Sequence, residues 1–221
     1  MAQSNRTRPE VIVDKNGKIT TVHRANEQAG KNSARLSGLG HRSSRVVDGV
    51  EKKVLQFSTA ETAVLIRETL KDEFKADYPN VKFSVRSSSY SGGSSINISY
   101  VDGPPESEVE AFSELYAGAT FNGMIDLKEY KQSAKNADGT NVVYGPDFVF
   151  VRREMSPEAA VAAKSELAGY LGHPITDDHV FVETPHQMDD MYEKNGLRRR
   201  YDATVYELMN VIATNNANVN K

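Results

Sequence analysis

The chain has 221 residues, a length that can bury a core in one domain with extensions or in two small domains. It contains no Cys, which excludes disulfides, thiolate metal sites and cysteine nucleophiles; this fits a reducing compartment, and we expect a cytoplasmic protein. The apolar runs are far shorter than the ~20 residues of a membrane span, and residues 1–30 hold no stretch that resembles a signal peptide, so no membrane contact is expected.

The beginning of the chain is basic. Residues 1–53 hold eleven Lys and Arg against five Asp and Glu, whereas the rest of the chain is acidic. Within this segment, Asn16-Gly17 separates two runs of β-branched residues, which predicts a β-hairpin. Residues 24–50 are rich in Ser, Gly and Arg and lack apolar periodicity, which predicts a flexible linker.

These patterns divide the chain into three parts. We assign residues 1–50 to a basic arm made of the hairpin and the flexible linker, residues 53–214 to a folded α+β domain, and residues 215–221 to a disordered tail.

The domain begins with a helix followed by two strands. Ser58 and Glu61 have the spacing of a capping box, and apolar residues at intervals of three and four predict a helix over 59–75. Residues 81–85 and 96–100 alternate apolar and polar side chains, which predicts two half-buried strands.

The segment 84–105 contains eight Ser and three Gly residues. Because strands flank residues 87–95, we interpret that stretch as a long hairpin connection, with Gly92 and Gly93 providing positive φ angles at its tip. A phosphate-binding loop is disfavoured because such loops join a strand to a helix. Hydrogen-bond donors gather beside the glycines, so we propose a candidate binding site here, whose members are Arg86, Ser88, Tyr90, Gly92 and Gly93.

A second helix is predicted from the acidic residues after Pro105 to about Tyr116. The fold class is therefore α+β, with a largely antiparallel sheet and helices packed on one face around a helix-strand-strand-helix unit. Later in the chain we predict a β segment over 141–152, a helix over 158–171, a short strand at 180–182 and a final helix over 202–213.

No constellation of residues fixes a reaction. The histidines at 173, 179 and 186 lie near acidic residues but lack the spacing that places two imidazoles on one metal, so neither a metal nor a cofactor is expected. The carboxylate pairs Asp126 with Glu129 and Asp102 with Glu106 fit turn and cap roles as well as acid–base roles.

Basic residues supply a second candidate binding site, made of Arg198, Arg199 and Arg200. These side chains, together with Arg152 and Arg153, have the chemistry to contact phosphate or an acidic protein surface. Exposed aromatic side chains would add base stacking. Whether Tyr90, Tyr100 and Tyr130 are exposed is not encoded in the sequence pattern.

Six stretches have a specific order and spacing: 65–74, 81–86, 90–96, 102–104, 118–126 and 144–150. Together they resemble large polyvalent protein associated domain 29 over about residues 59–155. Members of that family occur in proteins of phages, prophages and conjugative elements. The resemblance implies an accessory protein in the cytoplasm of an infected bacterium, with host takeover or counter-defence as its use. No reaction is implied, and Asn122 stands where Asp is expected.

The sequence therefore predicts stoichiometric binding of a macromolecule, with a host or phage protein as the expected partner, and enzymatic activity is not favoured. Two alternatives stay open. One is a nucleic-acid-binding module that uses the basic arm and Arg198–Arg200. The other is an enzyme with its site at the Arg86–Gly93 hairpin. The sequence contains no signal for an oligomeric state.

Overall fold

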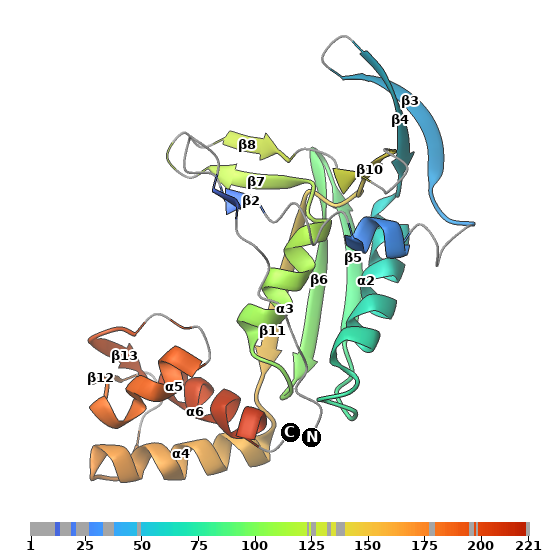
Figure 1. The fold of residues 1–221 in the computed structure, drawn as a ribbon. Helices are drawn as coiled ribbons and strands as arrows, with labels where there is room; N and C mark the ends of the chain where they lie inside the picture. Colours follow the sequence, from blue (N-terminus) through green and yellow to red (C-terminus); the bar gives the residue numbers. More distant parts are fainter. Residues whose placement is uncertain are drawn as a thin grey trace. The chain divides into compact units, whose positions relative to one another are not determined.

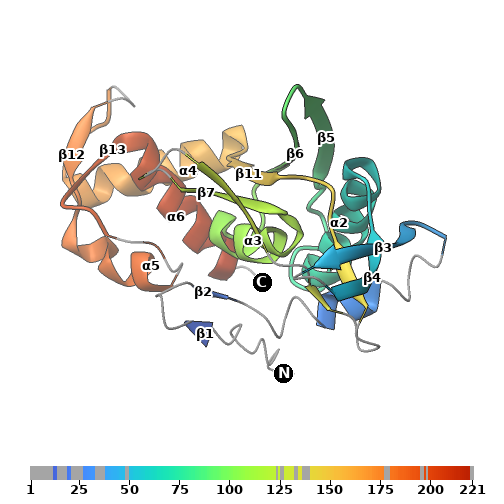
Figure 2. The ribbon, with the colours of Figure 1, turned by 90° about the horizontal axis from the view of Figure 1, so that it is seen from above.

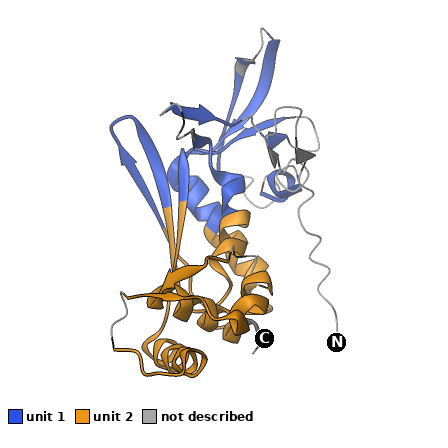
Figure 3. Cartoon of the chain, turned by 90° about the vertical axis from the view of Figure 1, so that its left-hand side faces the viewer, with its two compact units in different colours: residues 1–66, 86–96, 113–149 blue, residues 67–85, 97–112, 150–221 orange. Residues whose placement is uncertain are grey.

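A computed structural model describes residues 12–13, 19–20, 27–32, 38–47, 50–122, 124, 127–131, 134–135, 140–176, 180–194, 197 and 199–219. The fold class is α+β, as the sequence predicts, with the strands divided among small sheets (Figure 1). The chain forms two compact units, coloured separately in Figure 3. Unit 1 comprises residues 1–66, 86–96 and 113–149, and unit 2 comprises residues 67–85, 97–112 and 150–221.

Unit 1 contains a four-stranded sheet in the order β3-β4-β10-β9. Its strands are β3 (His41–Val47), β4 (Val50–Gln56), β10 (Asn141–Val143) and β9 (Ala134–Lys135). β3 and β4 form an antiparallel ribbon, whereas β10 runs parallel to β4. This sheet is therefore mixed, with one parallel pair beside two antiparallel pairs, and residues 57–140 supply the long connection that a parallel pair needs.

Two small hairpins also lie in unit 1. β1 (Ile12–Val13) pairs with β2 (Ile19–Thr20), as the sequence predicts, and the Asn16-Gly17 turn lies outside the described residues. β7 (Ala119–Asn122) pairs with β8 (Leu127–Tyr130), a hairpin for which the sequence pattern made no prediction.

The prediction of a flexible linker over 24–50 is wrong for two stretches. Residues 41–47 form β3, and residues 27–32 are helical. The side chain of Asn32 is fully buried and donates hydrogen bonds to the hydroxyls of Tyr116 and Tyr144, at 3.3 and 3.2 Å. The buried amide of Asn32 thus helps to attach residues 27–32 to the rest of unit 1, a long-range contact that composition does not reveal.

The capping box at the start of α2 (Thr59–Phe74) is confirmed. The Ser58 hydroxyl accepts from the Glu61 amide at 3.2 Å, and the Glu61 carboxylate accepts from the Ser58 amide at 2.8 Å. The same carboxylate also accepts from the amide of Gly40 at 3.0 Å. These bonds, those from Ser58 first, lower the pKa of Glu61 below its ordinary value of 4.5.

The serine-rich segment forms strands, not a long loop. β5 (Ser84–Tyr90) and β6 (Gly93–Val101) are joined by Ser91 and Gly92 alone, and Gly92 has a φ of 90°. Gly92 thus confirms the predicted positive φ, whereas Gly93 lacks one. The prediction failed because residues 86–90 of this edge strand are all exposed and show no apolar alternation.

β6 is the middle strand of a sheet in the order β11-β6-β5, where β11 spans Phe148–Glu154. In unit 2, the ring of Phe74 on α2 contacts Phe83 and also Phe112 on α3 (Glu106–Ser113). Phe83 in turn contacts Tyr100 on β6 at a centroid distance of 5.0 Å. The two predicted helices therefore pack toward the same side of β6 within this unit.

The rest of unit 2 is mainly helical. Helix α4 (Pro157–Leu171) has the predicted N-cap at Ser156 and ends at Gly172, whose φ is 73°. It packs against α6 (Val205–Val219) through Ala163, Leu167, Leu208 and Ile212 (Figure 2). The predicted short strand is β12 (Phe181–Glu183). A 3₁₀ turn (His186–Met188) and α5 (Asp189–Lys194) follow it and were not predicted. No helix in the described part of the chain is long and apolar enough to cross a membrane.

The final helix differs from its prediction at both ends. Residues Asp202–Thr204 form β13, which pairs with β12, so the helix starts at Val205. Thr204 and Glu207 cap it reciprocally. At the other end, α6 continues through the stretch predicted to be disordered, and Asn216 donates to Glu166 on α4 at 2.9 Å.

Replacing Asn32 by Ala should lower the free energy of unfolding by about 2 kcal/mol, because two buried tyrosine hydroxyls lose their donor. Urea unfolding measures this change, with Ala in place of the exposed neighbour Lys31 as the control. Equal stabilities of the two variants would mean that the hydrogen bonds of Asn32 do not stabilise the fold.

The capping box should make stability depend on acid pH. Because the folded-state pKa of Glu61 is lowered, its contribution is complete above about pH 5 and is lost as the pH falls through that lower pKa. The stability difference between the wild type and Glu61→Gln should therefore be constant above pH 5 and shrink below pH 4.5. A difference that stays constant down to pH 3 contradicts this role.

Candidate functional site

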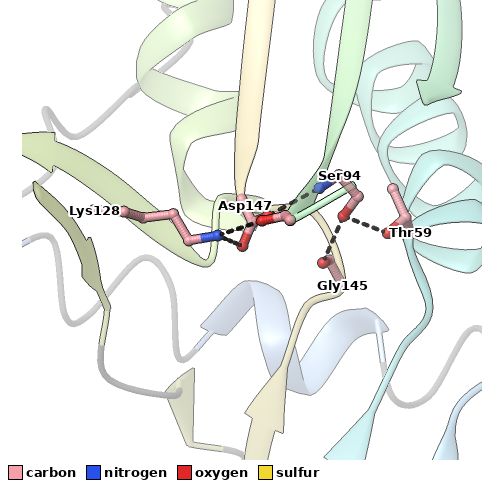
Figure 4. Close-up of polar contacts among 6 residues, drawn as sticks. Thr59, Ser94, Lys128, Gly145 and Asp147 are labelled. Carbon is pink, nitrogen blue, oxygen red and sulfur yellow. Dashed lines mark hydrogen bonds and ion pairs between the residues drawn. The ribbon is translucent and has the colours of Figure 1, made fainter. Parts of the chain in front are cut away.

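Asp147 lies at the centre of a polar network in unit 1, drawn in Figure 4. It follows β10 and the Gly145-Pro146 turn, immediately before β11. One carboxylate oxygen lies 2.9 Å from Nζ of Lys128 on β8, and the other accepts from the amide of Ser94 on β6 at 2.9 Å. The main chain of Asp147 also bonds to Ser94 and Ala119. One residue thus holds strands from three regions of the sequence.

The network continues to the start of α2. The Thr59 hydroxyl donates to the Ser94 hydroxyl at 2.9 Å, which donates to the carbonyl of Gly145 at 3.2 Å. The amide of Gly145 donates to the buried hydroxyl of Thr62 at 3.3 Å. We call Thr59, Thr62, Ser94, Lys128, Gly145 and Asp147 the polar hub.

Two glycines make the hub possible. A Cβ on Gly145 would lie against backbone atoms of Ser58 and Thr59 and 2.8 Å from the carbonyl oxygen of Phe57. A Cβ on Gly93 would lie 2.5 Å from the Asp147 carboxylate. The backbone therefore approaches its neighbours more closely than any other residue type permits.

The hub is arranged to hold the fold. The proton of the Ser94 hydroxyl points to a carbonyl group, and both carboxylate oxygens of Asp147 have partners. The hydrogen bond to Asp147 raises the pKa of Lys128, which keeps this amine charged. Within the described contacts, the hydroxyls of Thr59 and Ser94 donate to a hydroxyl and a carbonyl oxygen, and neither is paired with a side chain that would act as a general base.

The predicted hairpin residues are partly brought together. Arg86, Ser88 and Tyr90 alternate along β5, so their side chains share one face of this edge strand. All three side chains are exposed. Carbon atoms of the Tyr90 ring lie 3.1 and 3.3 Å from the Cβ position of Gly93, which places the ring next to the hub.

Exposed aromatic side chains continue on the β7–β8 hairpin. Phe121 pairs with Lys128 in the register, and Tyr130 lies on the same face two residues further along β8. The ammonium of Lys128 lies 4.9 Å from the centroid of the Tyr130 ring. The exposed fractions are 51% for Tyr90, 61% for Phe121 and 71% for Tyr130, whereas Tyr100 is buried.

We call Tyr90, Phe121 and Tyr130 the aromatic surface. The polar hub connects the members of this surface. Asp147 contacts Gly93, which lies beside the Tyr90 ring, and it also contacts Lys128. Lys128 in turn lies beside Phe121 and Tyr130 on the β7–β8 hairpin. Tyr90 and Tyr130 were candidates for exposed aromatic side chains from the sequence, whereas Phe121 was not predicted. The feature that could have revealed Phe121 is an aromatic residue in a stretch that has no helical periodicity.

The arginine site is placed differently. Arg199 forms an ion pair with Asp189 and donates to the carbonyl of Thr184, and Arg200 forms an ion pair with Glu207. Arg198 lies outside the described residues. Arg199 and Arg200 belong to unit 2, whereas Arg86–Gly93 belong to unit 1. The positive charges of Arg199 and Arg200 are thus neutralised by acidic side chains of unit 2.

The two arginines of β11 have opposite environments. Arg152 is exposed and forms an ion pair with Glu154. Arg153 is buried, donates to Asn210 at 2.7 Å, and leaves Nε and one terminal nitrogen without a hydrogen-bond partner among the described residues. Burial lowers the pKa of Arg153.

The remaining candidates are structural or undescribed. No group of three potential metal-ligating side chains exists among the residues that the structure describes, and His179 and Asp126 are not among them. Asp102 accepts from the amide of Ser156 at 3.1 Å, and Glu106 accepts from the amide of Arg153 at 3.2 Å. These carboxylates therefore act as caps of the main chain.

Replacing Gly145 by Ala should destabilise the protein by about 2–3 kcal/mol, because the added methyl group meets backbone atoms that cannot move away. Gly169 on α4 is the matched control: no described atom lies within 4 Å of its Cβ position, so Gly169→Ala should stabilise by about 1 kcal/mol. Thermal unfolding compares the two. A Gly145→Ala variant as stable as wild type would show that the close approach is not required.

Comparison with known proteins found no matching curated protein and no matching solved structure. One family matches, over residues 57–156, a range that contains the whole polar hub and the aromatic surface. This match confirms the resemblance inferred from the sequence motifs over about residues 59–155. Residues 57–156 of the chain thus match the model of the family named large polyvalent protein associated domain 29.

Proposed function

We propose that the chain is an accessory protein of a phage or mobile element that acts by stoichiometric binding of a macromolecule through the aromatic surface. The observation that carries this proposal is the exposure of three large aromatic side chains on strands held in place by the polar hub.

The energetics favour binding. Each aromatic ring buries a large area on contact, and Tyr and Phe are frequent anchors of interfaces. The rings of Phe121 and Tyr130 lie on a separate two-stranded sheet whose register is fixed by four cross-strand pairs. Because Lys128 of that hairpin is bonded to Asp147, the rings are positioned before a partner arrives.

The enzyme alternative at the Arg86–Gly93 hairpin receives less support from these contacts. The polar groups next to that hairpin are used in bonds that join strands, and the hydroxyl protons of Thr59 and Ser94 are directed to oxygen atoms of the hub. Counter-defence in a bacterial host is the biological use that we propose, and its support is the family alone.

Affinity capture of the tagged full chain from infected host cells, followed by reconstitution with the recovered partner, tests this function. We expect a complex of fixed stoichiometry by light scattering that is lost with Tyr130→Ala. The matched control is Tyr201→Ala in unit 2, because Tyr201 is also 71% exposed.

Two results would contradict the proposal. One is a partner that binds Tyr130→Ala and Phe121→Ala as tightly as the wild type. The other is multiple turnover of a small molecule that is lost when Ser94 or Asp147 is replaced.

A further inference from the structure

We infer that the aromatic surface binds single-stranded nucleic acid, with bases stacked on Tyr90, Phe121 and Tyr130. This inference rests on the proposed function and names the class of partner that the surface receives.

The geometry of the rings is suited to base stacking. Phe121 and Tyr130 are diagonal neighbours on one face of the β7–β8 hairpin, a relation that separates side chains by about 7–8 Å. Every base has a π face, so an exposed ring provides a stacking platform that tolerates any sequence. Three such rings around one hub provide a short track for successive bases.

The two units differ in charge. Unit 1 holds fifteen Lys and Arg against eleven Asp and Glu, whereas unit 2 holds twelve against nineteen. Unit 1 is therefore basic, with its excess of positive charge in residues 1–53, although the whole chain has a net charge of −3. This asymmetry favours a polyanion over an uncharged apolar ligand as the partner of unit 1.

Several individual cations of unit 1 are exposed. Arg86 shares a face of β5 with Tyr90, about 13 Å away along the strand, and makes no ion pair within the described residues. On the β3–β4 ribbon, Arg42 and Lys53 are exposed and lie on one face, since Ser44 pairs with Lys53. Arg86, Arg42 and Lys53 are therefore exposed cations of unit 1 that can contact phosphates, whereas Lys128 and Lys131 are paired with Asp147 and Glu114.

A single strand fits this surface better than a duplex. In a duplex the bases are stacked on one another, so their faces are not available to protein side chains, whereas a single strand presents them. The surface also lies on strands and short turns, with no described helix that presents its side chains to a groove.

Fluorescence anisotropy with a labelled deoxythymidine oligonucleotide of about 12 nucleotides, near the usual length for one binding module, tests the inference with the full chain. We expect Tyr130→Ala and Phe121→Ala each to weaken binding about 5- to 100-fold, the range for loss of one stacked base. Tyr201→Ala should bind as the wild type does. Circular dichroism establishes that each variant is folded.

Salt dependence tests the phosphate contacts separately. With three contacts, the logarithm of the association constant should fall with the logarithm of salt concentration with a slope of about −2. Arg86→Gln should reduce the size of that slope by about 0.7, whereas Arg152→Gln, at a 78% exposed side chain of unit 2, should leave it unchanged.

Three outcomes would overturn the inference: no binding of the oligonucleotide, equal affinity for a duplex of the same length, or equal loss with Tyr201→Ala and Tyr130→Ala. If a purified protein partner binds without nucleic acid and is lost with Tyr130→Ala, the inference fails while the proposed function stands. If neither kind of partner depends on the aromatic surface, both fail.

Discussion

The carboxylate of Asp147 is the constraint on which unit 1 depends. It binds the ammonium of Lys128 and the amide of Ser94, and so connects β8 and the tip of the β5–β6 hairpin to the chain that enters β11. Its side chain is only 13% exposed, so the loss of one partner would leave a poorly hydrated charge. Bonds between a charged group and its partners are stronger than neutral ones, which explains why one residue can hold three strands.

This constraint also assigns roles to the surrounding side chains. The polar groups of the hub are occupied by one another, which leaves the exposed rings and the exposed Arg86 as groups that can meet a partner. Close backbone approach at Gly93 and Gly145 keeps the hub compact. The interior thus provides rigidity, and binding is left to side chains on the strand surfaces.

Local patterns in the sequence predicted local structure well. The Ser58–Glu61 box, the positive φ at Gly92 and the start and end of α4 each depend on residues within one or two turns. The hub joins residues 59, 94, 128 and 147, and no local pattern connects them. For the same reason, composition could not reveal that Asn32 is buried between two tyrosines, or that exposed serines continue strand β5.

The central claim is that Asp147 positions the aromatic surface, and amide hydrogen exchange tests it most directly. In Asp147→Ala, residues 92–95 and 119–130 should exchange faster than in the wild type, while α4 and α6 of unit 2 stay unchanged. Asp190→Asn, at an exposed carboxylate of unit 2, is the control and should alter neither region. Unchanged exchange at residues 92–95 and 119–130 in Asp147→Ala would contradict the account, as would a uniform increase across both units.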